Sequence, residues 1–160
     1  MEGNLIFRRA FIEDLETIIR LILQDDLAQE REVIEEEATI DQRYIDAFHK
    51  IDSDENHYLM VVECRKEVVG TCHLTLIPSL TFIGTTRMQI EAVRVSQEYR
   101  GRKIGTKMIE SALAYAKMKG ASLVQLTTNK QRPEALKFYE QQGFKATHEG
   151  MKLYLRKTFF

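Results

Sequence analysis

A short basic segment, residues 100–106, lies between a predicted strand and a predicted helix. Its glycines, Gly101 and Gly105, permit a tight turn, and a helix that begins there presents unpartnered backbone N–H groups at the positive end of its dipole. Such a helix start binds phosphate groups. Four basic side chains stand at this end, which otherwise disfavours cations: Arg100, Arg102, Lys103 and Lys107. The pattern favours an anionic ligand; the alternative is a basic helix start that binds nothing.

The strand that precedes this segment, predicted over residues 87–96, changes face along its length. Apolar side chains occupy even positions at Met88 and Ile90 and odd positions at Val93 and Val95. Because alternate residues of a strand point to opposite faces, the slip indicates an inserted residue, a β-bulge, at residues 91–93. A bulge leaves backbone groups unpaired, and a ligand with amide groups can bind them as a further strand would. If both faces of the strand are buried, the pattern carries no such information.

Hydrophobic periodicity places these segments in an alternating series of elements. Strands are predicted over residues 5–10, 58–64, 68–77, 87–96 and 122–127, with two short ones at about 144–148 and 152–156. Helices are predicted over residues 15–23, about 40–51, from 103 to Gly120, and from Pro133 to Gly143. The order is β-α-α-β-β-β-α-β-α-β-β, which predicts an α/β fold with one mixed, mostly antiparallel, twisted sheet flanked by helices.

The composition is that of an ordinary globular protein, and we expect residues 1–160 to form one domain. The chain has 23 Lys and Arg against 24 Asp and Glu, a net charge of -1, and 44% hydrophobic residues. This balance argues against nucleic-acid and membrane partners. No apolar run is long enough to cross a bilayer and no secretion signal is apparent, so we expect a cytoplasmic protein. Cys64 and Cys72 form no CxxC motif, and no metal site is expected.

Two motifs resemble the GNAT superfamily of N-acetyltransferases. Residues 100–105 resemble its acetyl-coenzyme A signature, [Gln/Arg]-x-x-Gly-x-[Gly/Ala], with Lys103 in place of the first glycine. Asn129 after a strand, then Phe138-Tyr139 and Gly143 on and after a helix, resemble the family's strand-Asn-helix-Phe-Tyr-x-x-x-Gly-Phe region. A left-handed backbone at Lys103 would cost about 1–2 kcal/mol, whereas an ordinary helical one would cost nothing.

This resemblance implies a GNAT-like fold and transfer of an acetyl group from acetyl-coenzyme A directly to a primary amine of a small molecule or peptide. Acid and base groups would act while both substrates are bound, without a covalent enzyme intermediate. The residues that would bind acetyl-coenzyme A are Val93, Arg94, Val95, Arg100, Gly101, Arg102, Lys103, Ile104, Gly105, Thr106 and Asn129. On spacing alone, Asn129 is a loop-forming residue. An alternative function is a non-catalytic sensor that binds acyl-coenzyme A.

The chemistry of amine acetylation needs a proton acceptor, because a lysine-like amine with a pKa near 10.4 is protonated at pH 7. Glu91, at the predicted bulge, is the candidate general base; the alternative is a strand carboxylate paired with a neighbouring arginine. His73 is held in reserve, as an ordinary polar strand position is the more common role. By resemblance, Tyr139 donates a proton to the leaving thiolate; otherwise it packs beside Phe138.

The acceptor amine is less well defined. Residues 24–56 hold twelve acidic and three basic residues, a balance of -9, which would attract a cationic amine or simply form a solvated surface. A weaker resemblance of residues 127–132 and Phe138-Tyr139 to the aminoalkylphosphonate acetyltransferases implies an anionic acceptor instead, and both options stay open. The terminal Phe159-Phe160 pair suggests a possible homodimer contact, although a frayed tail is the simpler expectation.

Overall fold

The structure is a computed structural model that describes residues 3–24 and 40–156. Its five strands are β1 (Leu5–Arg9), β2 (His57–Cys64), β3 (Glu67–Pro78), β4 (Thr86–Val95) and β5 (Leu123–Leu126). Its helices are α1 (Leu15–Leu23), α3 (Gln42–Asp52), α4 (Thr81–Gly84), α5 (Ile104–Met118) and α6 (Pro133–Gln141), with short 3-10 turns at Ile12–Asp14 and Gln97–Tyr99. The acidic residues between 25 and 39 and the Phe159-Phe160 pair lie outside the described residues.

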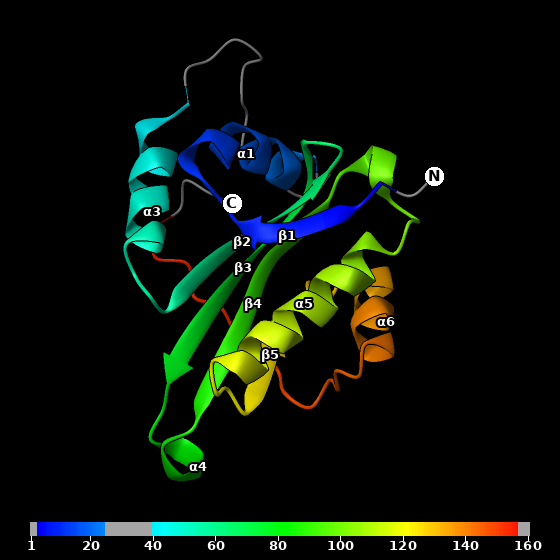
Figure 1. The fold of residues 1–160 in the computed structure, drawn as a ribbon. Coiled ribbons are helices and arrows are strands. Elements are labelled where there is room, and N and C mark those ends of the chain that lie inside the picture. Colours follow the sequence, from blue (N-terminus) through cyan, green and yellow to red (C-terminus); the bar gives the residue numbers. More distant parts are fainter. Residues whose placement is uncertain (1–2, 25–39, 157–160) are drawn as a thin grey trace.

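The five strands form one sheet in the order β1-β2-β3-β4-β5. Neighbouring strands from β1 to β4 run antiparallel, and β5 runs parallel to β4 after the crossover through α5. Helices α1 and α3 cover one face of the sheet, and α5 with α6 lies on the other (Figure 1). The predicted mixed, mostly antiparallel sheet flanked by helices is confirmed.

The α5 face of the sheet carries the larger apolar core. Helix α5 buries one stripe of side chains, because apolar residues recur along it every three or four positions. The buried stripe consists of Ile104, Met108, Ile109, Ala112 and Ala116. It packs against Met60, Cys72, Leu74, Met88 and Ile90 of the sheet. The helix gives way to Gly120, whose φ of 76° is left-handed, as predicted. Helix α5 is therefore held at its buried stripe and begins at Ile104 with its first turn beside β4.

The predicted strands over residues 144–148 and 152–156 are wrong, because the structure has no strand in either range. Alternating apolar residues form a strand only where a neighbouring strand and an apolar surface receive them. The side chains of Met151, Leu153 and Leu155 are instead 94%, 87% and 91% exposed, and β5 is only four residues long. The sequence did not predict α4 at the tip between β3 and β4. No helix among the described residues has the length and apolar character needed to cross a bilayer.

Candidate functional site

One inserted residue in β4 interrupts its ladder with β3. Glu91 pairs with His73 and Arg94 pairs with Thr71, so two β4 residues, Ala92 and Val93, stand opposite one β3 residue. Ala92 has a left-handed φ of 51°, a conformation that costs a non-glycine residue about 1–2 kcal/mol. The bulge predicted from the change of face is confirmed.

The bulge coincides with the end of the pairing between β4 and β5. Strand β5 pairs with β4 only from Arg87 to Ile90, where it meets Leu126. Beyond Ile90, β4 has no strand on that side, and a cavity of about 520 Å³ opens there. Val93, Arg94 and Val95 line one wall, and Phe138 and Tyr139 of α6 line the other. A strand edge with exposed backbone groups therefore faces an aromatic wall.

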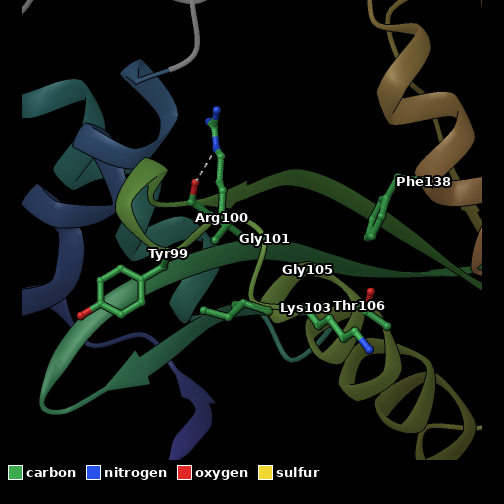
Figure 2. Close-up of a pocket in the computed structure, with 9 residues that line it drawn as sticks. Tyr99, Arg100, Gly101, Lys103, Gly105, Thr106 and Phe138 are labelled. Carbon is green, nitrogen blue, oxygen red and sulfur yellow. Dashed lines mark hydrogen bonds between the residues drawn. The ribbon is translucent and has the colours of Figure 1, made fainter. Parts of the chain in front are cut away.

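A second cavity, of about 290 Å³, lies at the start of α5 (Figure 2). Gly101, Lys103, Ile104 and Thr106 line it, together with residues that also line the larger cavity. The shared residues are Val95, Arg100, Gly105 and Phe138, so the two cavities adjoin. Lys103 precedes the first helical residue and makes no side-chain cap bond, which leaves the first N–H groups of α5 available to a ligand. Helix start and strand edge thus form one groove.

The groove has basic residues at its ends, although not all of the predicted ones reach it. Arg100 donates from its Nε to the carbonyl of Val95 at 3.4 Å, and Arg94 donates from Nη1 to the carbonyl of Val93 at 2.9 Å. Burial lowers the pKa of Arg94 from its ordinary value. Arg102 instead lies over the Tyr99 ring, 4.9 Å from its centroid, and does not line either cavity.

Asn129 follows β5 and does not itself line either cavity, although its backbone carbonyl accepts a hydrogen bond from the N–H of Arg132, which lines the larger one. Its side-chain oxygen accepts a hydrogen bond from the backbone N–H of Gln131 at 2.9 Å, which closes a turn before α6. In the structure as it stands this amide shapes the loop, and its contact with a cofactor stays a prediction.

The two candidate catalytic side chains approach the bulge from different elements. Glu91 is exposed, directly precedes Ala92 and pairs with His73 across the β3–β4 ladder. Tyr139 is half-buried on α6, with ring centroids of Phe138 and Phe144 at 5.1 and 6.0 Å. Burial raises the pKa of Tyr139 above its ordinary value, so its hydroxyl holds its proton at neutral pH. Tyr139 lines the larger cavity and Glu91 does not.

The thiol of Cys72, opposite the bulge, is unreactive. Cys72 stands opposite the bulge on β3 and is fully buried, and its Sγ lies 3.9 Å from the sulfur of Met60. Burial raises the pKa of Cys72 to about 12, so the thiol stays protonated and is a poor nucleophile. Across residues 3–24 and 40–156, no cluster of three His, Cys, Asp or Glu side chains is placed to hold a metal ion.

Several lining residues were not predicted as site residues: Gln24, Gln97, Tyr99, Arg132, Glu134, Ala135 and Phe138. Phe138 explains why Gly105 is glycine. A Cβ at residue 105 would lie 3.3 Å from the Phe138 ring, closer than most real contacts, so the glycine lets α6 approach α5. The Phe-Tyr pair was visible in the sequence, but the approach of two helices that lie apart in the chain was not.

Comparisons with known proteins agree with this geometry. Residues 19–144 match the family model of the acetyltransferase (GNAT) family. The aminoalkylphosphonate N-acetyltransferase of Salmonella typhimurium is 30% identical over 145 residues, which cover 88% of this chain and 85% of that protein. A structure described as a transcriptional regulator from Bacillus halodurans is 41% identical, with a TM-score of 0.89, and covers 95% of this chain and 100% of its own. A predicted acetyltransferase from Clostridium acetobutylicum, solved with acetyl-coenzyme A, has the same fold, with a TM-score of 0.71 at 20% identity over 95% of this chain and 97% of its own.

Lys103 has a left-handed φ of 59°, so the backbone here carries the strain that glycine would avoid. We expect Lys103→Gly to raise the free energy of unfolding by about 0.5–1 kcal/mol, the relief of strain less the entropy that glycine adds to the unfolded chain. Denaturant titration measures the change. Lys107→Gly, one turn into α5, is the control and should lower stability by about 1 kcal/mol. Equal destabilisation by both variants would contradict a strained Lys103.

Proposed function

The chain belongs to the acetyltransferase (GNAT) family and is an acetyl-coenzyme A-dependent acyltransferase; we propose that it moves the acetyl group directly to a primary amine of a small molecule or peptide. One observation carries this proposal. The groove joins an uncapped helix start at Lys103 to the open edge of β4 beyond the bulge. A long ligand with phosphates at one end and amides in its arm matches both parts of that groove.

Acetyl-coenzyme A fits the residues that are present. Its phosphates would lie at the N–H groups that begin α5, beside Lys103 and Arg100. The amides of its pantetheine arm would bond to the backbone of Val93 and Val95, as an added strand would. When bound, it supplies an activated acetyl group on a thiol leaving group. The chain supplies alignment, and holding two reactants in line accounts for much of the rate of such a reaction.

Glu91 would act as the general base and Tyr139 as the general acid. Glu91, at the bulge, accepts a proton from the acceptor amine, directly or through a water molecule, which turns the ammonium group into a nucleophile. Tyr139 keeps its hydroxyl proton at neutral pH and donates it to the departing thiolate. Cys72 is buried with a pKa of about 12 and is therefore a poor nucleophile. This favours direct transfer over a route through an acetylated cysteine.

The acceptor class rests on two considerations that point in different directions. The relative from Salmonella typhimurium, at 30% identity, is named for aminoalkylphosphonates, which carry an anionic group. The acidic balance of residues 24–56 would favour a cationic amine. A non-catalytic acyl-coenzyme A sensor would use the same groove and lack turnover.

An amine panel separates these functions. Release of free coenzyme A is followed with a thiol reagent while the protein and acetyl-coenzyme A meet aminoalkylphosphonates, polyamines, amino sugars and peptides. We expect release that depends on the amine. Binding of acetyl-coenzyme A without release by any amine would support the sensor and contradict the transferase.

Glu91→Gln removes the proposed proton acceptor and keeps the size of the side chain. We expect kcat to fall by about 10²- to 10⁴-fold, with the affinity for acetyl-coenzyme A unchanged. A pH-rate profile and cofactor titration by calorimetry measure the two effects. Glu110→Gln, an exposed carboxylate on α5, is the control. An unchanged rate and pH profile in Glu91→Gln would remove this residue from the base role.

Tyr139→Phe keeps the ring in its aromatic surroundings and removes the hydroxyl. If the hydroxyl donates a proton, kcat should fall by about 10- to 1000-fold while the protein stays as stable as before. Tyr115→Phe is a matched control, because Tyr115 is also half-buried, also has a pKa raised by burial, and packs against Tyr58 away from the groove. Equal rates in both variants would assign Tyr139 to packing alone.

A further inference from the structure

A row of polar side chains crosses the sheet on its α1 and α3 face, next to Glu91. The strand register places His57, Thr75, Gln89 and Gln125 directly opposite one another across β2 to β5. Gln125 donates to the side-chain oxygen of Gln89 at 2.8 Å. The residues between them along the strands, such as Leu74, Met88 and Ile90, face the apolar core on the other side. One face of the sheet therefore carries a continuous polar row across four strands.

Two histidines within and beside this row are in direct contact. Nδ1 of His57 and Nε2 of His73 are 2.8 Å apart, which is hydrogen-bonding distance. His73 in turn stands opposite Glu91, where directly paired side chains have Cβ atoms about 4.5–5.5 Å apart. On the other side, Nε2 of His57 lies 3.8 Å from the carboxylate of Asp54. A line of ionisable groups thus runs from Glu91 through two imidazoles to Asp54.

The surroundings of His57 favour one tautomer for each ring. Its Nε2 faces the Asp54 carboxylate, an acceptor 3.8 Å away, which favours the tautomer with the proton on Nε2. Its Nδ1 then accepts, and both neighbours of that atom can donate: Nε2–H of His73 at 2.8 Å and the hydroxyl of Thr75 at 3.4 Å. Nδ1 of His73 is left as an acceptor on the ring that stands opposite Glu91. In this arrangement, each ring offers one acceptor nitrogen and one N–H donor, in line from Glu91 towards Asp54.

Among the described residues, charged groups approach the pair from β4, from the turn after α3 and from β1. Glu91 faces His73 from β4, and Asp54 faces His57 from the turn after α3. Arg9 of β1 donates to the backbone carbonyl of His57 at 3.2 Å and also pairs with Asp52 at 3.8 Å. Helix α1 packs against β3 and β4 through apolar residues, and its Arg20 and Glu16 pair with each other in solvent. Burial and the neighbouring His57 lower the pKa of His73, while Glu91 raises it.

We propose that, while bound substrates cover the otherwise exposed Glu91, His73 and His57 form a proton relay that carries the proton taken up by Glu91 to solvent beside Asp54. The relay rests on the proposed acetyl transfer. An ammonium substrate loses two protons as it becomes an amide: one ends on the thiol through Tyr139, and the other passes through Glu91. Glu91 returns that proton to Nδ1 of His73, the Nε2 proton of His73 moves to Nδ1 of His57, and the Nε2 proton of His57 leaves to Asp54 or water. Exchange with water then restores both tautomers.

The exposed end of the line suits proton release. The side chains of His57 and Asp54 are 28% and 47% exposed, and His73, on the next strand, is half-buried. His73 and His57 are thus relay residues that act through Glu91, and neither needs to touch the acceptor. Their loss should slow the removal of the proton that Glu91 takes from the amine, without weakening substrate binding.

Steady-state kinetics of four single variants test the relay, because the chain has four histidines. We expect His57→Gln and His73→Gln each to lower kcat by on the order of 10-fold, less than the roughly 10²- to 10⁴-fold of a direct acid or base. KM for the amine and affinity for acetyl-coenzyme A should not change. In the wild type, the plot of kcat against pH should fall on its acid side as His73 becomes protonated, below the ordinary histidine pKa of 6.5, because only neutral His73 can accept the proton. This acid-side fall should disappear in both variants. His49→Gln and His148→Gln, both exposed, should keep it.

NMR titration of the histidine ring protons gives a readout independent of activity. His57→Gln should raise the pKa of His73, because it removes the repulsion that arises when both rings are protonated, and Glu91→Gln should lower it. These shifts keep the test decisive even where His73→Gln folds poorly. An active wild-type protein in which His57→Gln and His73→Gln behave like the two controls would overturn the relay and leave the transferase intact. A wild-type protein that acetylates no amine would instead overturn the proposed function.

Discussion

The site depends on one extra residue in β4. Ala92 breaks the ladder with β3 at the point where β5 stops pairing, and the two events together turn a continuous sheet into a forked one. The fork exposes the backbone of Val93 and Val95 and leaves room for Tyr139 to approach from α6, while Glu91 lies directly before the bulge. The left-handed backbone at Ala92 persists because paired residues on both sides, Glu91 and Arg94, fix the register of the strand.

The two faces of the sheet differ in polarity and in the role that we propose for each. On the α5 face, a close-packed apolar core fixes where α5 begins and so fixes the phosphate end of the groove. The other face is only partly covered by apolar side chains of α1 and α3, and a polar row crosses it between His57 and Gln125. In our proposals, acetyl-coenzyme A binds at the open edge of β4, and protons leave along the polar face. Glu91, at the bulge, is the residue that belongs to both.

The sequence predicted those features that depend on neighbours along the chain. The change of face between Ile90 and Val93 predicted the bulge, and the glycines and basic residues around Gly105 predicted the helix start. It could not predict features that depend on packing between distant segments. Arg102, a predicted cofactor-binding residue, lies over the Tyr99 ring instead. The alternating apolar residues from Met151 onwards are exposed and do not pair with a strand. The contact between His57 and His73 needs the β2–β3 register, which hydrophobic pattern alone did not supply.

Lys103 illustrates how a departure from a family motif changes the physics of a site. Where glycine would offer only a relaxed backbone, this chain has a left-handed lysine and gains an exposed ammonium group beside the groove. The attraction of that exposed charge for an anion is screened over a Debye length of about 10 Å at 0.1 M salt. The backbone amides of α5 act at contact distance and are screened far less. The affinity of the α5 helix start for an anionic ligand therefore depends partly on the salt concentration of the solution.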